Sequence, residues 1–82
     1  HSPDNMSKRL PALKADKIVK TLLRAGFYVY HQRGSHLQLR HNIKTDLRVT
    51  IPRHNNFDLP PFVVNSILKQ ANLSKDEFLK LL

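Results

Sequence analysis

The sequence predicts a single α+β domain in which a three-stranded antiparallel sheet carries helices on one face. Three observations support this fold class: a stretch of helical periodicity comes first, three short β-type segments follow, and two further helical stretches close the chain. With 82 residues, the chain has material for only one hydrophobic core. We therefore expect the order α-β-β-β-α-α, with the second face of the sheet left open.

We expect this domain to occupy residues 7–82. Residues 1–6 lack hydrophobic periodicity, and residues 1–5 precede Met6, so we expect an expression remnant or a disordered N-terminus there. The chain has no Cys, which excludes disulfides and thiolate metal sites. We find neither an apolar run of membrane-spanning length nor a secretory leader, and therefore expect a cytoplasmic protein without membrane contact.

The first helix is predicted over residues 15–25. Gly26 follows at the position where a glycine commonly ends a helix. Basic residues between the apolar ones are typical of a solvated face and receive no functional role. The residues that we expect to face the core are Ile18, Val19, Leu22 and Leu23.

A β-hairpin is predicted next, with strands over residues 27–32 and 36–41. A three-residue loop over residues 33–35 would pair Val29 with Leu39 and His31 with Leu37, so that apolar positions meet on one face. A two-residue loop would place Val29 opposite Gln38 and mix polar with apolar side chains. We therefore expect the three-residue loop.

The rest of the chain predicts one strand and two helices. Alternating apolar residues form a strand over residues 47–51, before Pro52 ends the ladder. Pro60 and Pro61 suit the start of a helix. Ser74 and Glu77 form a capping-box pattern for a final helix that runs to about Leu81. The apolar face of the longer helix is expected to contain Phe62, Val63, Ile67, Leu68 and Ala71.

The open face of the sheet is predicted to be basic and aromatic. The formal net charge is +8, and between Arg24 and His54 the chain has six Lys or Arg, four His and a single acid, Asp46. This excess indicates a polyanionic partner, nucleic acid above all, although solubility alone is the alternative. His31 and His41 are expected on the core side or its rim. The residues expected on the open face are Tyr28, Tyr30, Gln32, His36, Gln38, Arg40, Arg48 and Thr50.

Gly34-Ser35-His36 is the strongest candidate for chemistry, because it presents an imidazole at the mouth of the hairpin beside Arg33. RNA carries its own nucleophile in the 2′-OH, so its cleavage needs proton transfer and stabilisation of phosphate charge, but no metal. From these residues alone, an inert histidine at a strand end remains an alternative. Tyr28 and Tyr30 either stack on unpaired bases or are simply good strand formers. No histidine pair has helical metal-binding spacing, so we expect no metal site.

Three motifs resemble the HicA toxins, the mRNA interferases of type II toxin-antitoxin systems. These are Gly26-Phe27 after the first helix, Arg33-Gly34-Ser35-His36 at the hairpin, and Ile51-Pro52-Arg53-His54 followed by Ile67-Leu68-Lys69-Gln70-Ala71-Asn72-Leu73-Ser74. The resemblance covers nearly all of the chain from about Ala15 to Phe78. Together the motifs are fairly specific, whereas the Gly-Ser-His triplet alone is weak.

The resemblance implies a fold like that of double-stranded-RNA-binding domains, and a metal-independent endoribonuclease without cofactor that cleaves mRNA. It implies that His36 is the catalytic acid or base, and that a HicB-type antitoxin blocks the site. We expect any association with DNA to occur only through the antitoxin complex. The expected RNA-binding residues are Arg33, Gly34, Ser35, Arg40, Arg48, Tyr28, Tyr30 and His54.

This chain departs from the family pattern at Leu37, where many members have a second histidine or a basic residue. The tail over residues 78–82 extends beyond the common core, where it is expected to cover apolar surface or to support self-association. The alternative function is a non-catalytic RNA-binding module that uses the same basic face. A third hypothesis is an interaction subunit whose basic patch binds only an acidic protein.

Overall fold

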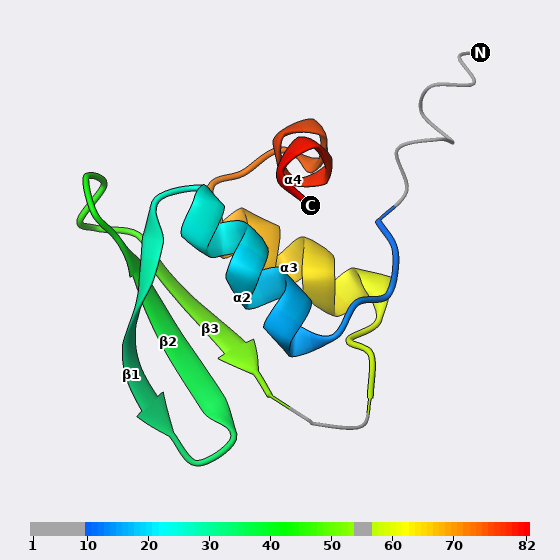
Figure 1. Cartoon of the computed structure of the whole chain (residues 1–82), viewed down its shortest axis with the longest axis horizontal. Coiled ribbons are helices and arrows are strands. Elements are labelled where there is room, and N and C mark those ends of the chain that lie inside the picture. Colours follow the sequence, from blue (N-terminus) through cyan, green and yellow to red (C-terminus); the bar gives the residue numbers. More distant parts are fainter. Residues whose placement is uncertain (1–9, 54–56) are drawn as a thin grey trace.

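The computed structural model describes residues 10–53 and 57–82 and shows the predicted α+β fold (Figure 1). Its elements, in chain order, are α2 (Ala15–Arg24), β1 (Phe27–Arg33), β2 (His36–His41), β3 (Arg48–Pro52), α3 (Pro61–Ala71) and α4 (Lys75–Leu81). The strands form one antiparallel sheet in the order β1-β2-β3. The predicted order of elements is therefore confirmed. The expectations for residues 1–6 and for His54 lie outside the described residues.

The core lies between the sheet and the three helices. The hairpin end of β1 and β2 extends beyond the helices (Figure 1), and in β1 only Phe27 is buried. Within the described part of the chain, no helix is long and apolar enough to cross a membrane. The buried side chains include Ile18 and Leu22 of α2, Leu37 and Leu39 of β2, Val49 and Ile51 of β3, Val64, Ile67, Leu68 and Ala71 of α3, and Phe78 of α4.

Helix α2 buries one stripe, formed by Ala15, Ile18, Leu22 and the polar Thr21. The hydroxyl of Thr21 donates a hydrogen bond of 2.8 Å to the carbonyl oxygen of Lys17, which satisfies the buried oxygen. Our expectation that Leu23 faces the core is wrong, because its side chain is 46% exposed. Leu23 is one position beyond the buried stripe, and a rotation of about 100° per residue turns it toward solvent.

Helix α3 buries residues at positions i, i+3, i+4 and i+7, which places its stripe at Val64, Ile67, Leu68 and Ala71. Phe62 was expected in this face, but it is 75% exposed. It stands in the first turn, out of phase with the stripe. The helix ends at Asn72, which has a left-handed φ of 56°.

Helix α4 begins with the predicted capping box. The Ser74 hydroxyl accepts from the Glu77 amide and the Glu77 carboxylate accepts from the Ser74 amide, both at 3.0 Å. Phe78 is fully buried, and the Arg24 guanidinium donates to the carbonyl oxygen of Leu81 at 2.8 Å. The C-terminal tail therefore covers apolar surface, the first of its two expected roles.

The hairpin combines a two-residue turn with a β-bulge. Phe27 pairs with His41 and Val29 with Leu39, as predicted for the outer half of the hairpin. The register then shifts between Val29 and His31, so that His31 pairs with Gln38 and Arg33 with His36. The three-residue loop and the pairing of His31 with Leu37 are therefore wrong predictions. The extra residue lies within β1, at Tyr30, where a bulge gives one strand two residues opposite one.

The bulge exchanges the faces of two side chains. His31 was expected on the core side, but it pairs with Gln38 and is exposed on the open face. Gln32 was expected on the open face, but it pairs with the buried Leu37 and belongs to the helix side. Because successive side chains alternate, inserting one residue reverses every later position in the strand.

Candidate nucleic-acid interface and catalytic site

The turn of the hairpin fixes the position of His36. Arg33 and His36 pair across the turn, so that Gly34 and Ser35 form its two central residues. Gly34 has φ of 58°, and a glycine with positive φ at the first central position is typical of a type II′ turn. His36 is the first residue of β2 and is exposed. The local sequence thus places the imidazole at the free end of the sheet.

The imidazole of His36 is available to a ligand. Its cross-strand neighbours are Arg33 on β1 and Pro52 on β3. Among residues 10–53 and 57–82, no side chain or backbone group forms a hydrogen bond or ion pair with its ring. Both ring nitrogens therefore lack a hydrogen-bond partner within the described ranges and are open to a bound molecule.

The open face is organised in rows that cross the three strands, because paired residues share a face. None of its members is acidic, and the pairs include two cations directly opposite each other, Arg40 and Arg48. From the hairpin turn inward, the rows are Arg33–His36–Pro52, His31–Gln38–Thr50 and Tyr28–Arg40–Arg48.

Arg40 and Arg48 form the inner basic part of this face. Like charges directly opposite in a sheet are destabilising, and neither guanidinium has an acidic partner among the described residues. The Arg40 guanidinium lies 3.8 Å from the centroid of the Tyr30 ring, at the bulge. A hollow between the strands is lined by Gln38, Arg40, Arg48 and Thr50, among others. An anion in this hollow would relieve the repulsion.

Arg53 is a residue near the hairpin that our sequence analysis did not single out. Its amide donates to the Ser35 carbonyl oxygen at 2.6 Å, which joins the end of β3 to the turn. Its Nε lies 3.2 Å from the Asp16 carboxylate, and its side chain lines a hollow with Gln32, Gly34 and Ser35. Position 53 follows a strand-ending proline, and no local pattern in the sequence shows that this loop folds back onto the turn.

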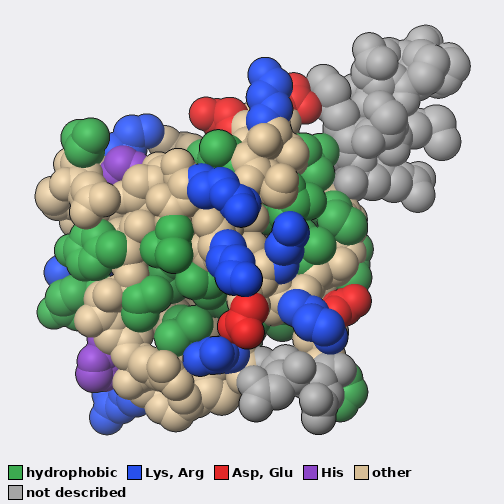
Figure 2. Space-filling model, viewed as in Figure 1, with side chains coloured by type: hydrophobic (Ala, Val, Ile, Leu, Met, Phe, Trp, Pro, Cys, Tyr) green, Lys and Arg blue, Asp and Glu red, His purple; other side chains and the backbone are tan. Residues whose placement is uncertain are grey.

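A second group of cations lies on the helix side of the molecule. Lys and Arg side chains gather over α2 in Figure 2, whereas the surface over the sheet in that view is mostly apolar and neutral. Lys17, Lys20 and Arg24 are the exposed basic residues of this helix. Their spacing is that of a solvated helix face, as predicted.

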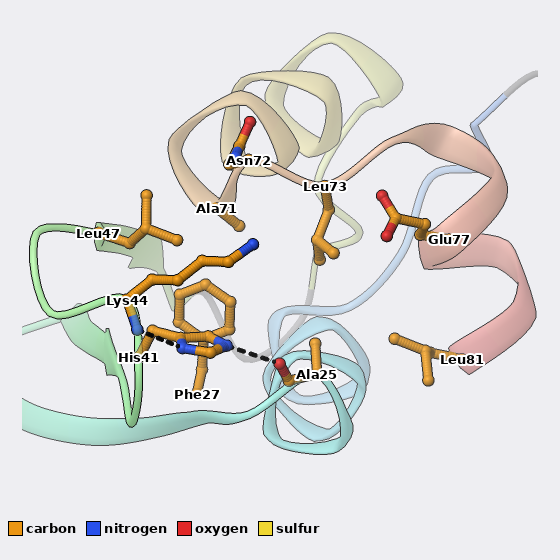
Figure 3. Close-up of a pocket in the computed structure, with 10 residues that line it drawn as sticks. All are labelled: Ala25, Phe27, His41, Lys44, Leu47, Ala71, Asn72, Leu73, Glu77 and Leu81. Atoms are coloured by element: carbon orange, nitrogen blue, oxygen red, sulfur yellow. Dashed lines mark hydrogen bonds between the residues drawn. The ribbon is translucent and has the colours of Figure 1, made fainter.

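His41 has a structural role rather than a chemical one. Its Nδ1 accepts from the amides of Ile43 and Lys44, at 3.1 and 3.0 Å, and its Nε2 lies 3.0 Å from the Ala25 carbonyl oxygen. Because Nδ1 faces two donors, Nε2 must carry the proton and donate to Ala25. Figure 3 shows the ring beside a pocket between the β2–β3 connection and the helices. The prediction that His41 is a partly buried and hydrogen-bonded imidazole is therefore confirmed.

The predicted site residues that the structure describes form two neighbouring groups. Arg33, Gly34, Ser35 and His36 meet at the hairpin turn. Tyr28, Tyr30, Arg40 and Arg48 meet farther along the same face. The placement of His54 is outside the described residues. In the two described ranges, no group of three or more His, Asp or Glu side chains has an arrangement that could hold a metal ion.

Fold and surface together define a small basic α+β domain with an α-β-β-β-α layout and an open sheet face rich in cations. A comparison with protein-family models matches residues 15–73, more than half of the chain, to the family described as HicA toxin of bacterial toxin-antitoxin. The chain therefore belongs to the HicA family of toxin-antitoxin toxins. No curated protein matches it. Helix α4 lies beyond the matched region.

Proposed function

We propose that this protein is an endoribonuclease that cleaves mRNA, with His36 as a general acid or base. HicA toxins are generally ribonucleases that cleave mRNA, and membership of this family supports the reaction class. The observation that carries the proposal is the exposed His36 ring beside Arg33, on a sheet face where none of the described residues is a carboxylate. An RNA phosphate bound at this place would contact both the Arg33 cation and the proton-transfer group of His36.

The chemistry requires little beyond these groups. The 2′-OH of RNA attacks the adjacent phosphorus, so the enzyme moves protons and stabilises the charge of the phosphorane. His36 supplies proton transfer, and Arg33 stands opposite it, where a guanidinium can bind a phosphate oxygen. This route uses no metal, because the nucleophile is part of the substrate.

The remainder of the open face binds the RNA strand. Arg40 and Arg48 attract phosphate groups away from the cleaved bond, and Tyr28 and Tyr30 offer aromatic surface to unpaired bases. Gly34 and Ser35 hold the turn and contact the RNA there, and His54 is the weakest of these candidates. A HicB-type antitoxin would block cleavage by covering this face, and DNA would be reached only through that complex.

The deciding experiment incubates purified wild-type protein and the His36→Ala variant with a defined RNA in EDTA, followed by end-group analysis. We expect wild-type protein to release a 2′,3′-cyclic phosphate, and the variant to lose cleavage by a factor of about 100 or more. Expression of His36→Ala in bacteria should no longer arrest growth. Circular dichroism of the variant should match that of wild-type protein, since His36 is exposed.

Full toxicity or full cleavage by His36→Ala would eliminate the assignment. A non-catalytic RNA-binding module is the second candidate, and the same basic face supports it. It predicts RNA affinity that falls with salt and no product from wild-type protein. An interaction subunit for an acidic protein predicts no RNA affinity at moderate salt.

A further inference from the structure

The bulge in β1 places a second histidine on the same face as His36. We propose that His31 is the second acid-base group of the reaction and works as the partner of His36. The proposal rests on the ribonuclease function proposed above. It assigns one imidazole to the 2′-OH and the other to the leaving 5′-oxygen.

The strand register sets the distance between the two histidines. His31 pairs with Gln38, and His36 lies two residues before Gln38 on β2. The two histidines are therefore diagonal cross-strand neighbours, whose separation in sheets is roughly 7 to 8 Å. The pairing is regular from His31 to Arg33, so the bulge does not disturb this part of the hairpin. Two rings on one face at this spacing can contact opposite sides of one phosphodiester.

His31 is also accessible and uncommitted. It is exposed, and within the described ranges no group forms a hydrogen bond or ion pair with its ring. This contrasts with His41, whose ring nitrogens both bond to backbone. Its ring nitrogens are therefore open to hydrogen bonds with a bound RNA.

The second acid-base group cannot come from position 37, the residue that follows His36 on β2. In this chain Leu37 is 5% exposed and packs into the core. A side chain at position 37 therefore faces the helices, on the opposite side of the sheet from His36. On β1, the diagonal neighbour of His36 on the open face is His31.

The charged and titratable groups around His31 are cationic or aromatic. Arg33 stands two residues along β1, Arg40 and His36 are the two diagonal neighbours on β2, and Tyr30 precedes it at the bulge. Gln38 and Thr50 complete its row. Within the described residues, none of the members of this face is a carboxylate, so RNA phosphate is the anion that these cations attract.

The proton balance of the step is complete. One neutral imidazole takes the proton of the 2′-OH as the 2′-oxygen forms a bond to phosphorus. The bond from phosphorus to the 5′-oxygen breaks, and the other imidazole, protonated at the start, gives its proton to that oxygen. The products are a 2′,3′-cyclic phosphate and a 5′-hydroxyl, and the two histidines have exchanged protonation states. No oxidant, reductant or metal takes part.

The test compares wild type, His31→Gln and His36→Gln on two RNAs. One is an ordinary RNA, and the other has sulfur in place of the bridging 5′-oxygen at the cleavage site, a leaving group that needs no protonation. We expect both variants to cleave ordinary RNA at least about 100-fold more slowly than wild type. One of the two, the variant that lacks the acid, should recover most of the wild-type rate on the sulfur substrate, and the other should not.

The pH profile gives an independent readout. Wild type should show a bell-shaped dependence of kcat/KM, and each variant should lose one limb of it. Gln32→Ala is the matched control, because Gln32 is adjacent on β1 but pairs toward the helix side. We expect its rate within about twofold of wild type.

Three outcomes would overturn the proposal. The first is a His31→Gln rate within threefold of wild type while His36→Gln is inactive, which leaves the ribonuclease function intact. The second is an equal loss on both RNAs for both variants, with a higher KM for His31→Gln, which indicates binding only. The third is the absence of cleavage by wild type, which removes the function itself.

Discussion

Gly26 lies against the imidazole ring of His41. A Cβ atom at Gly26 would stand 2.8 Å from Nε2 of His41, and the φ of Gly26 is +98°. The same ring joins the end of α2 to the β2–β3 connection through its bonds to Ala25, Ile43 and Lys44. Phe27 meets the ring edge to face, with 4.8 Å between centroids. The glycine therefore allows the close approach on which this joint depends.

We predict that Gly26→Ala destabilises the fold by about 1 to 3 kcal/mol or more, because the new methyl group meets His41 and φ is unfavourable for alanine. Chemical denaturation measures the free energy of unfolding. Gly34→Ala is the control, since φ there is 58° but nothing lies within 4 Å of the added atom. It should cost less, about 1 to 2 kcal/mol. Equal losses would show that the contact with His41 contributes nothing.

Phe78→Ala should cost about 3 to 5 kcal/mol, because the ring is fully buried and its removal leaves a cavity. Its helix lies beyond the region matched to the family. Leu82→Ala, at a partly exposed neighbouring position, should change stability by less than about 0.5 kcal/mol. Thermal melting of both variants checks this prediction. A Phe78→Ala variant as stable as wild type would mean that α4 is dispensable.

We predict that the free energy of unfolding depends on the ionisation of Glu77 at acid pH. The hydrogen bond from the Ser74 amide, followed by that from the Ser74 hydroxyl, lowers the pKa of Glu77 below its ordinary 4.5. A lowered pKa in the folded state gives stability that is present above 4.5 and is lost as pH falls through the folded pKa. Wild type should therefore exceed Glu77→Gln in stability at pH 7, and the difference should shrink toward pH 3. Denaturant unfolding at both pH values measures it, and a difference that does not change with pH would contradict the linkage.

Arg40→Gln should weaken RNA binding by roughly tenfold, the scale of one charge-assisted hydrogen bond to phosphate. The slope of log affinity against log salt should also decrease by about 0.7 for single-stranded RNA. Fluorescence anisotropy in the His36→Ala background measures binding without cleavage. Lys69→Gln, which removes the charge of an exposed side chain on α3, is the matched control and should leave both quantities unchanged. Equal effects of the two variants would indicate attraction by net charge alone.

Local sequence signals predicted most of the fold. The Ser74 and Glu77 capping box is a contact between near neighbours in the chain, and it was confirmed. The alternation of Leu37 and Leu39 on β2, with Val49 and Ile51 on β3, identified the buried face of the sheet. The errors at Leu23 and Phe62 concern the edges of helical stripes, where the packing partner, rather than periodicity, decides which residue is covered.

The candidate site was predicted less completely, because part of it depends on contacts between strands. Both loop lengths considered for the hairpin assumed one register throughout. The bulge at Tyr30 separates two registers: Val29 meets Leu39, as the three-residue loop requires, but His31 then meets Gln38, a pairing that neither loop predicts. A single inserted position leaves no mark on local alternation, and so His31 was assigned to the wrong face. Arg53 was missed because its contact with Asp16 joins distant parts of the chain.

The register shift in β1 also affects how the outer edge of this strand can pair with a strand from another chain. β1 is an outer strand of the sheet, and such strands offer unpaired amides and carbonyls that invite cross-β growth. The offset at Tyr30 interrupts their even spacing, so a second chain cannot continue the ladder along the full length of the strand. On the opposite outer strand, the Thr50 amide already donates to the Gln70 side chain at 2.8 Å. The same bulge that turns His31 outward thus shortens the regular edge that β1 offers to a second strand.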